Sequence, residues 1–337
     1  MAQTASKPDP AIRQVTIAAL LCALLSACAS APPPPDPEPV VIVEPEPEIP
    51  IVVADPEPQP EPVAAPEPPK VTIVLSSRSA AYEDVAEELG NLFETVSIYD
   101  LTDRSQPPER AFRLINDSDT DAVVAIGLRA ARSSVALAAV PVVFSQVFNH
   151  QDHALVGERS RGVAAIAPVD VQLAAWKEAQ PTLVNVGLVI GPGHDELIAG
   201  AEIAALERGI SLSVHIANSD QEALYYFKRM VRDIDGFWLL PDNRVLSARV
   251  LREIVDQSNR RGVTVLVPNP SMLQMGAAIS VSTVASDIAA RISEVIAMIH
   301  SGELGIVPAI TPLSETLIET NEAVLGQHAT ASTEAQQ

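Results

Sequence analysis

The sequence predicts an α/β fold built on parallel β-sheets, and the number of expected strands favours two sheets over one. From Lys70 onward, short apolar runs rich in β-branched residues alternate with stretches of helical periodicity. Continuous apolar runs are typical of strands that are buried on both faces of a parallel sheet. Strand–helix alternation of this length implies βαβ units with right-handed crossovers.

The expected strands share this apolar composition and lie at residues 71–75, 96–99, 121–127, 141–144, 162–167, 184–190, 210–217, 236–240, 263–267 and 277–281. The expected helices place apolar residues three or four positions apart and lie at residues 82–93, 221–234, 247–261 and 285–299. In the first helix, for example, Val85, Leu89 and Leu92 share one face. Ten strands are many for a single sheet and comfortable for two.

The N-terminal residues 1–27 have the pattern of an export signal. Val15 to Leu25 is an apolar stretch of eleven residues, interrupted only by Thr16, and a membrane-spanning helix needs about 20. The stretch ends in Leu-Ser-Ala-Cys28, which resembles the lipobox of bacterial lipoproteins. The resemblance implies that Cys28 is lipidated and becomes the mature N-terminus. The alternative is an ordinary secretory signal, cut near Ala27 or Ala31.

The residue after the cysteine bears on location. In Gram-negative lipoproteins, Ala29 in place of Asp implies sorting to the outer membrane, and the inner membrane stays open as an alternative. We therefore expect a protein of the bacterial cell envelope, facing the periplasm. Two or three acyl chains, as the lipoprotein pattern implies, give the stable membrane attachment that a single chain does not.

Residues 28–70 are expected to form an extended tether. Residues 31–70 hold sixteen of the 29 prolines, nine acidic residues and one basic residue. Proline fixes φ and like charges repel, so the segment favours a semi-rigid polyproline spacer that reaches about 120 Å at ~3.1 Å per residue. Two apolar runs, Val40–Val43 and Ile49–Val53, interrupt it. Two interpretations of these runs stay open: they form only loose contacts within the linker, or they dock on a neighbouring protein.

Charge and composition exclude several classes of function. The net charge is −21 for the whole chain and −14 from residue 71 onward, where 33 acidic residues face 19 basic ones. Nucleic-acid binding depends on Lys and Arg contacts to phosphate, so no nucleic-acid partner is expected. Both cysteines precede residue 30, which leaves the folded region without a disulfide or a cysteine-based metal site.

No catalytic constellation stands out, and neither an enzyme nor a cofactor is expected. The chain has no Gly-x-Ser-x-Gly elbow. His150 and His153 lie near Asp152, but a polar loop is favoured over a metal site. Gly191-Pro-Gly193 lacks the Gly-Lys-Ser/Thr ending of a phosphate loop.

An ordered set of segments resembles the ABC-transporter substrate-binding family that includes aromatic-amino-acid binders. The segments are Asp121–Gly127 with Ala130-Ala131, Pro141–Phe144, Gly162-Val163, Asn185–Pro192, Leu239–Asn243, Gly276-Ala277 and the closing Leu317–Gly326. No single segment is specific, and their order over residues 71–327 carries the resemblance.

The resemblance implies a type I periplasmic-binding-protein fold, in which two Rossmann-like lobes are joined by three crossovers and close on a ligand. Lobe one would comprise residues 70–166 plus 284–310, and lobe two residues 167–283 plus 311–327. Residues 328–337 would form a disordered tail.

The chain departs from the family where the cleft is expected. Ser145–Asn149 stands where the family often has Asp-Pro-Val, and Ser280–Val284 where it often has paired tyrosines. His194-Asp195-Glu196 replaces the family's Ser at the start of a helix in lobe two. These departures place the usual ligand in doubt.

Ligands of doubly wound sheets bind at the carboxyl ends of the strands. The candidate ligand-binding residues in those loops are Ser76, Ser77, Arg78, Ser79, Gln146, Asn149, His194, Asp242, Asn243 and Asn269. The N–H groups at Ser76–Ser79 and the Arg78 cation suit a carboxylate, and Asp242 suits an ammonium group. The structural alternatives are an N-cap at Ser79 and a turn at Asp242-Asn243.

Two functions follow. The first is a lipid-anchored solute-binding protein that delivers a small molecule, with an amino acid as one candidate, to an ABC permease. The second is an envelope lipoprotein whose binding-protein-like domain contacts or regulates another envelope protein. An outer-membrane anchor would favour the second, because importers sit in the inner membrane.

Overall fold

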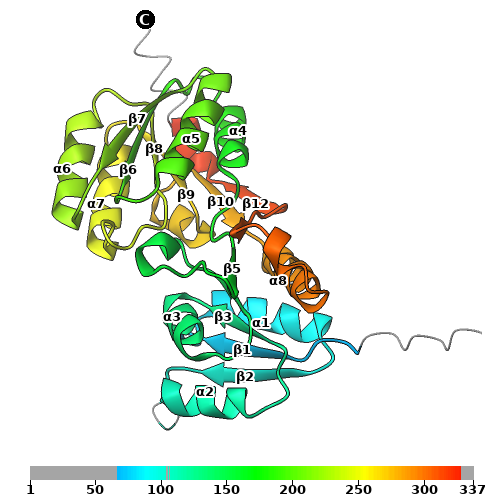
Figure 1. Ribbon diagram of the computed structural model, residues 1–337. Helices are drawn as coiled ribbons and strands as arrows, with labels where there is room; N and C mark the ends of the chain where they lie inside the picture. The colour runs from blue at the N-terminus through cyan, green and yellow to red at the C-terminus, as the bar shows by residue number, and fades with distance from the viewer. Residues whose placement is uncertain (1–66, 104, 106, 328–337) are drawn as a thin grey trace, which may run out of the picture. The chain divides into compact units, whose positions relative to one another are not determined.

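The computed structural model describes residues 67–327 except 104 and 106 (Figure 1). Cys28, Ala29, the signal segment, almost all of the tether and the 328–337 tail lie outside the described residues. Among the described residues, no helix is both long and apolar enough to cross a bilayer.

Lobe one is built on a parallel sheet with the strand order β11-β5-β4-β3-β1-β2. Its strands are β1 (Val71–Leu75), β2 (Val96–Asp100), β3 (Ala122–Ile126), β4 (Val142–Ser145), β5 (Ser160–Val163) and β11 (Ile310–Thr311). Its helices are α1 (Ala80–Leu92), α2 (Pro108–Asn116), α3 (Leu128–Leu137) and α8 (Ala285–His300), with the short helix η1 (His150–His153) after β4 and η3 (Leu304–Ile306) after α8.

Strand alternation divides the core of lobe one into two layers. In β1, Ile73 packs into the cluster formed with α1 and α8, whereas Val74 packs into the cluster formed with α2 and α3. Successive side chains of a strand point to opposite faces, so an unbroken apolar run serves both layers at once. This is why β1 and β3 are buried at every position and apolar at every position except Thr72.

Lobe two repeats the plan with the strand order β12-β10-β9-β8-β6-β7. Its strands are β6 (Asn185–Ile190), β7 (Ser211–Ile216), β8 (Gly236–Trp238), β9 (Thr264–Val267), β10 (Ile279–Thr283) and β12 (Thr316–Thr320). Its helices are α4 (Val169–Ala179), α5 (Asp195–Glu207), α6 (Asp220–Met230), α7 (Ala248–Asn259) and the short η2 (Pro270–Met275). Helices α4 and α5 cover one face, and α6 and α7 the other.

The two sheets confirm the predicted fold class, with two added strands and with the predicted strands at 162–167 and 236–240 ending early, at Val163 and Trp238. Strand β12 runs antiparallel to β10, and β11 is only two residues long, so neither forms a continuous buried run in the sequence. The apolar run at 162–167 is strand only to Val163. Its remainder leaves the sheet and crosses to α4, where it stays apolar because it is buried or half-buried between the lobes.

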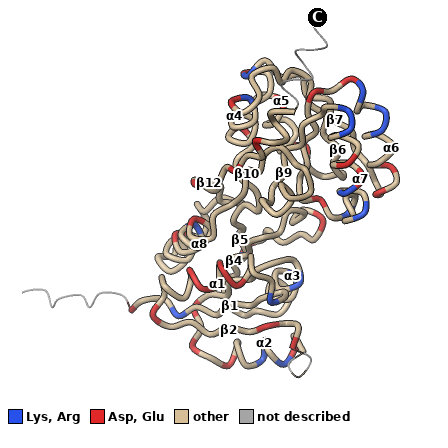
Figure 2. The backbone as a smooth tube through the Cα atoms, turned by 180° about the vertical axis from the view of Figure 1, so that it is seen from behind, with Lys and Arg blue, Asp and Glu red and all other residues tan. Residues whose placement is uncertain are grey.

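The chain crosses between the lobes three times, after β5, between β10 and α8, and between β11 and β12. Each crossing leaves the loops at the carboxyl ends of the strands free to face the other lobe. Figure 2 shows that charged residues gather on the helices and loops, while the inner strands β3, β4, β8 and β9 carry none. Any charged side chain at a site between the lobes must therefore come from outside these four strands.

Candidate functional site

A cavity of about 240 Å³ opens between the lobes at the carboxyl ends of their strands. We call it the cleft cavity. Its wall comes from both lobes and consists of Tyr82, Leu128, Gln146, Val147, Phe148, Asn149, Ala165, Pro241 and Asn243. Its volume and lining describe the ligand that this arrangement of the two lobes can hold.

Glycine at position 127 shapes the lobe-one wall of the cleft cavity. Gly127 precedes α3 with a φ of +86°, and a Cβ atom there would lie 2.7 Å from both the Tyr82 hydroxyl and the Ser76 hydroxyl. Ser76 Oγ accepts a hydrogen bond of 2.8 Å from the N–H of Ala130. The missing side chain thus lets Tyr82 lie against the start of α3, and burial raises the pKa of its phenol.

Gln146 adopts an unusual backbone conformation in the wall of the cleft cavity. Its φ is +59°, and among the described non-glycine residues only Ala154 shares a positive φ. The left-handed conformation costs an L-residue about 1–2 kcal/mol. Such strain concentrates at ligand sites, where it sets the direction of a side chain.

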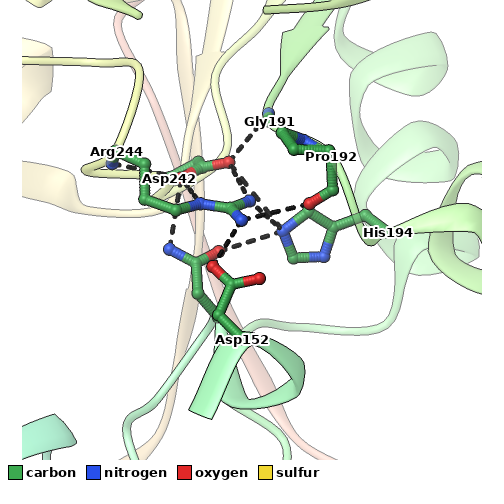
Figure 3. Close-up of polar contacts among 7 residues, drawn as sticks. Asp152, Gly191, Pro192, His194, Asp242 and Arg244 are labelled. Atoms are coloured by element: carbon green, nitrogen blue, oxygen red, sulfur yellow. Dashed lines mark hydrogen bonds and ion pairs between the residues drawn. The ribbon is translucent and has the colours of Figure 1, made fainter. Parts of the chain in front are cut away.

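Beside the cleft cavity lies a hydrogen-bonded group that we call the interlobe cluster. It consists of Asn149, Asp152, Gly191, Pro192, His194, Asp242 and Arg244 (Figure 3). Asn149 and Asp152 come from the loop after β4 in lobe one, and the others follow β6 and β8 in lobe two. The cluster joins the lobes through three contacts, which are Asn149 with Asp242, Asn149 with His194, and Asp152 with Arg244.

Asp242 is the centre of the interlobe cluster and is wholly buried. Arg244 forks onto it, with Nε 2.9 Å from Oδ1 and Nη2 2.7 Å from Oδ2. The N–H of Gly191 donates to Oδ2 at 2.8 Å, and the Asn149 amide donates to Oδ1 at 3.2 Å. Burial alone would raise the pKa of Asp242, but the bonds from Arg244 and Gly191 outweigh burial and hold that pKa below its usual value.

His194 is the second buried titratable group of the interlobe cluster, with 3% of its surface exposed. Its Nε2 lies 2.9 Å from Asn149 Oδ1 and 2.9 Å from Arg244 Nη2. Burial lowers the pKa of His194, the Asp242 carboxylate opposes that shift, and Arg244 adds to it. The neutral ring can donate to Asn149 or accept from Arg244, according to its tautomer.

Phe148 separates the cleft cavity from a second cavity of about 210 Å³. Its ring lies 4.6 Å from the His194 ring, centroid to centroid. The second cavity is bounded by the crossing segment 163–166 and by the start of α5, and most of its wall is apolar. Val147 and Phe148 line both spaces, so a shift of Phe148 would alter both.

The structure brings five of the ten predicted site residues to the cleft. Asn149, His194 and Asp242 meet in the interlobe cluster, while Gln146 and Asn243, like Asn149, line the cleft cavity. Ser76 lies behind the wall, where it bonds to the start of α3. Asn269 instead accepts from the N–H of Ser271 and caps η2.

The remaining predicted residues do not line the cleft cavity. Arg78 is exposed and pairs with Asp100 and Glu83. Ser79 is the exposed N-cap residue of α1, where its carbonyl accepts from the N–H groups of Tyr82 and Glu83. Ser77 is half-buried in the same loop.

Three residues that the sequence analysis did not select are central here. Arg244 holds Asp242, Tyr82 lines the cleft cavity, and Phe148 stacks on His194. The sequence could have predicted the ion pair of Arg244 with Asp242, because Arg244 follows Asp242 by two positions in a loop after a strand. Tyr82 and Phe148 carried no comparable signal, because an aromatic residue near a helix start or in an apolar loop is more often core.

The arrangement can bind and enclose a ligand. In the described part of the chain, no group of three His, Cys, Asp or Glu side chains is placed to hold a metal ion. The acidic and basic groups of the interlobe cluster are hydrogen-bonded to one another, and among the described residues no Ser or Thr is hydrogen-bonded to His194.

Comparison with known proteins gives a consistent result. The model of the ABC transporter substrate binding protein family matches residues 66–325. No curated protein matches.

Among solved structures, a ligand-free, open substrate-binding protein with adhesive properties from Clostridium difficile has 15% identity and a TM-score of 0.60, over 77% of this chain and 95% of that chain. An ABC domain in complex with L-Trp from Streptococcus pneumoniae has 14% identity and a TM-score of 0.56, over 78% and 95%. A conserved domain protein from Vibrio cholerae has 19% identity and a TM-score of 0.55, over 78% and 95%. At these identities, the likeness shows the fold.

Proposed function

The chain belongs to the ABC transporter substrate-binding protein family, and from that premise we propose that it is a lipid-anchored protein that binds a small molecule in the cleft cavity and hands it to an ABC permease. The family comprises extracytoplasmic binding proteins, not enzymes. The bilobed fold with three crossovers is the architecture that lets such proteins close on a ligand.

One observation carries the proposal, which is a cavity of about 240 Å³ walled by side chains from both lobes. Ligand pockets are typically about 300–1,000 Å³, so this one suits a small metabolite. A ligand held there would contact Gln146 of lobe one and Asn243 of lobe two at once. Such a ligand stabilises the closed form by its contacts with both lobes.

Ligand-dependent stabilisation tests this function. A ligand present at 100 times its Kd raises the free energy of unfolding by about 2.7 kcal/mol. We expect at least one member of a small-metabolite panel that includes amino acids to raise the unfolding midpoint saturably. If no compound shifts the midpoint, solute delivery is not the function.

The lipid anchor is proposed on the Leu-Ser-Ala-Cys28 sequence. Metabolic labelling with a palmitate analogue should mark the wild-type chain and not Cys28→Ser, whose product should move from the membrane to the soluble fraction. Cys22→Ser is the matched control, because Cys22 lies within the apolar part of the signal and should leave labelling unchanged. Labelling that persists in Cys28→Ser would contradict the anchor.

A second function is favoured by the internal pairing of the cleft's charges. Asp242, which the sequence analysis assigned to a ligand ammonium, is bonded to Arg244 instead. A domain that no longer bound solutes could keep such a closed cleft and act as an interaction module of the envelope, at the end of the acidic tether. Fractionation separates the two, because recovery with the inner membrane would contradict an outer-membrane interaction role.

A further inference from the structure

We propose that the cleft cavity takes an uncharged molecule with hydrogen-bonding groups on a partly apolar body, and that it excludes ligands with a free ammonium group. This inference rests on the proposed solute-binding function and names the chemical class of the solute. It follows from the chemistry of the wall, from the hydrogen bonds of Asp242 and from the position of Arg78.

Among the residues that the structure describes, those that line the cleft cavity include no Asp, Glu, Lys, Arg or His. Its polar groups are the amides of Gln146, Asn149 and Asn243 and the phenol of Tyr82, set among Leu128, Val147, Phe148, Ala165 and Pro241. An amide offers both donors and an acceptor, so these side chains can match carbonyl, amide or ring-nitrogen groups. They cannot neutralise a cation.

Two of the three amides are free to meet a ligand. Within the described part of the chain, the side chains of Gln146 and Asn243 have no hydrogen-bond partner, whereas Asn149 is already bonded to Asp242 and His194. The strained backbone of Gln146, with its φ of +59°, is an independent sign that the direction of this side chain matters.

The carboxylate of Asp242, which lies between the wall residues Pro241 and Asn243 in the chain, already accepts a full set of hydrogen bonds. Asp242 Oδ1 accepts from Arg244 Nε, from the Arg244 N–H and from Asn149, at 2.9, 3.2 and 3.2 Å. Its Oδ2 accepts from Arg244 Nη2 and from the Gly191 N–H, at 2.7 and 2.8 Å. A carboxylate has about four lone-pair sites, and five donors already surround this one. An ammonium group would have to displace the Arg244 guanidinium.

The arginine expected to bind a carboxylate is also unavailable. Arg78 keeps 65% of its side chain exposed and is paired with Asp100 and Glu83. It does not line the cleft cavity. A zwitterionic amino acid would therefore bring two charges against a wall with no charged side chain, and an unpaired charge that loses its hydration is disfavoured. An uncharged ligand avoids that cost.

Matched pairs of compounds test the inference on the full-length chain in detergent at pH 7. The zwitterionic probes are L-tryptophan, L-phenylalanine and L-leucine. Their uncharged partners are indole-3-propionamide, 3-phenylpropanamide and 4-methylpentanamide, which keep each side chain, lack the ammonium group and are no larger. Uracil and thymine add uncharged rings. Isothermal titration gives each Kd.

We expect at least one uncharged probe to bind, and to bind at least tenfold more tightly than its amino-acid partner where it has one. Tighter binding by a free amino acid overturns the inference and leaves the proposed function standing. If no probe binds, native mass spectrometry after incubation with a deproteinised cell extract decides. A bound uncharged mass supports the inference, a bound amine overturns it, and no bound mass overturns both the inference and the proposed function.

A variant pair places the ligand in the cleft cavity. Asn243 is exposed at the cavity wall, so Asn243→Ala should fold normally and weaken the bound probe about tenfold, as expected for one lost hydrogen bond. Asn91→Ala is the matched control, on the exposed face of α1 away from the wall. An unchanged Kd in Asn243→Ala would overturn the inference, because the ligand would then lie elsewhere.

Discussion

The interlobe cluster and the cleft cavity are neighbours built from the same loops, yet their chemistry is opposite. The cluster gathers Asp152, His194, Asp242 and Arg244 and bonds them to one another. The cavity beside it is lined by neutral side chains. In the loop after β8, two consecutive residues belong to different regions. Asp242 is hydrogen-bonded within the interlobe cluster, and Asn243 lines the cleft cavity.

This contrast shows that charged side chains beside a cleft can be paired with one another, so their presence alone does not predict a charged ligand. A buried carboxylate needs a full set of donors, and the protein supplies them here from its own chain. The polar groups left over for a ligand are then neutral amides. The following predictions test whether the two regions are as separate as the geometry indicates.

The largest effect is expected from Arg244→Ala. The substitution leaves Asp242 wholly buried without its main partner, which should cost about 3–5 kcal/mol of unfolding free energy. Arg78→Ala is the control, because an exposed arginine with two surface partners should cost no more than about 1 kcal/mol. Denaturant unfolding measures both, and equal losses would contradict the central place of Arg244.

Gln146→Gly should separate stability from binding. Glycine relieves the left-handed strain at φ +59°, so the free energy of unfolding should hold or rise by about 1 kcal/mol. Ligand binding should weaken about tenfold, because the amide is lost from the wall of the cleft cavity. Ala154→Gly relieves a similar strain at φ +47° outside the wall. It should leave the Kd unchanged, and weakening by both variants would contradict the role of the Gln146 side chain.

Acid should destabilise the protein through the buried His194 and the half-buried His150. Burial lowers the pKa values of His194 and His150, so below the unfolded value of about 6.5 the folded protein binds fewer protons than the unfolded chain. The stability is fully present above that pH and is lost as the pH falls toward the lowered pKa values. Asp242, with its own lowered pKa, adds a further loss at more acidic pH.

Unfolding midpoints between pH 7.5 and pH 5 measure this loss. His194→Asn should make the unfolding midpoint depend less steeply on pH, because it removes one of the two histidines whose pKa is lowered by burial. A slope that His194→Asn leaves unchanged would show that His194 does not titrate with a lowered pKa.

The smallest effect is expected from Asp152→Ala. Asp152 is the outer partner of Arg244, with 34% of its side chain exposed, and an ion pair of this kind contributes about 0.2–1 kcal/mol. The contact also joins the two lobes, so its loss should speed ligand release more than it changes unfolding. Stopped-flow dissociation and denaturant unfolding measure the two, and a loss near that of Arg244→Ala would mean that the cluster is one indivisible unit.

Most of the fold could be predicted because its inner strands are buried on both faces and read as apolar runs. Strand β12 escaped prediction because it lies at an edge, where each of its residues is half-buried or exposed, and Thr316–Thr320 forms no apolar run. Residues 164–167 were predicted as strand because burial between the lobes makes a crossing segment as apolar as a strand.

The candidate site was less predictable. The rule that ligands bind at the carboxyl ends of strands located the loops, and the structure places Gln146 and Asn243 at the cleft cavity. The role of Asp242 could not be read from the sequence, because the ion pair depends on how Arg244 folds back over two residues. The structural alternative for Asp242-Asn243 was a turn. That turn is present, because the Arg244 N–H donates to Asp242 Oδ1.

The positions of the two tryptophans give the molecule a built-in reporter of one half. Trp176 and Trp238 are both wholly buried in lobe two, where their indole N–H groups bond to Thr264 and Gln172. The chain has no other tryptophan. Selectively excited tryptophan fluorescence therefore follows the unfolding of lobe two alone, whereas circular dichroism follows both lobes. The gap between the two curves would measure how far the lobes unfold as one cooperative unit.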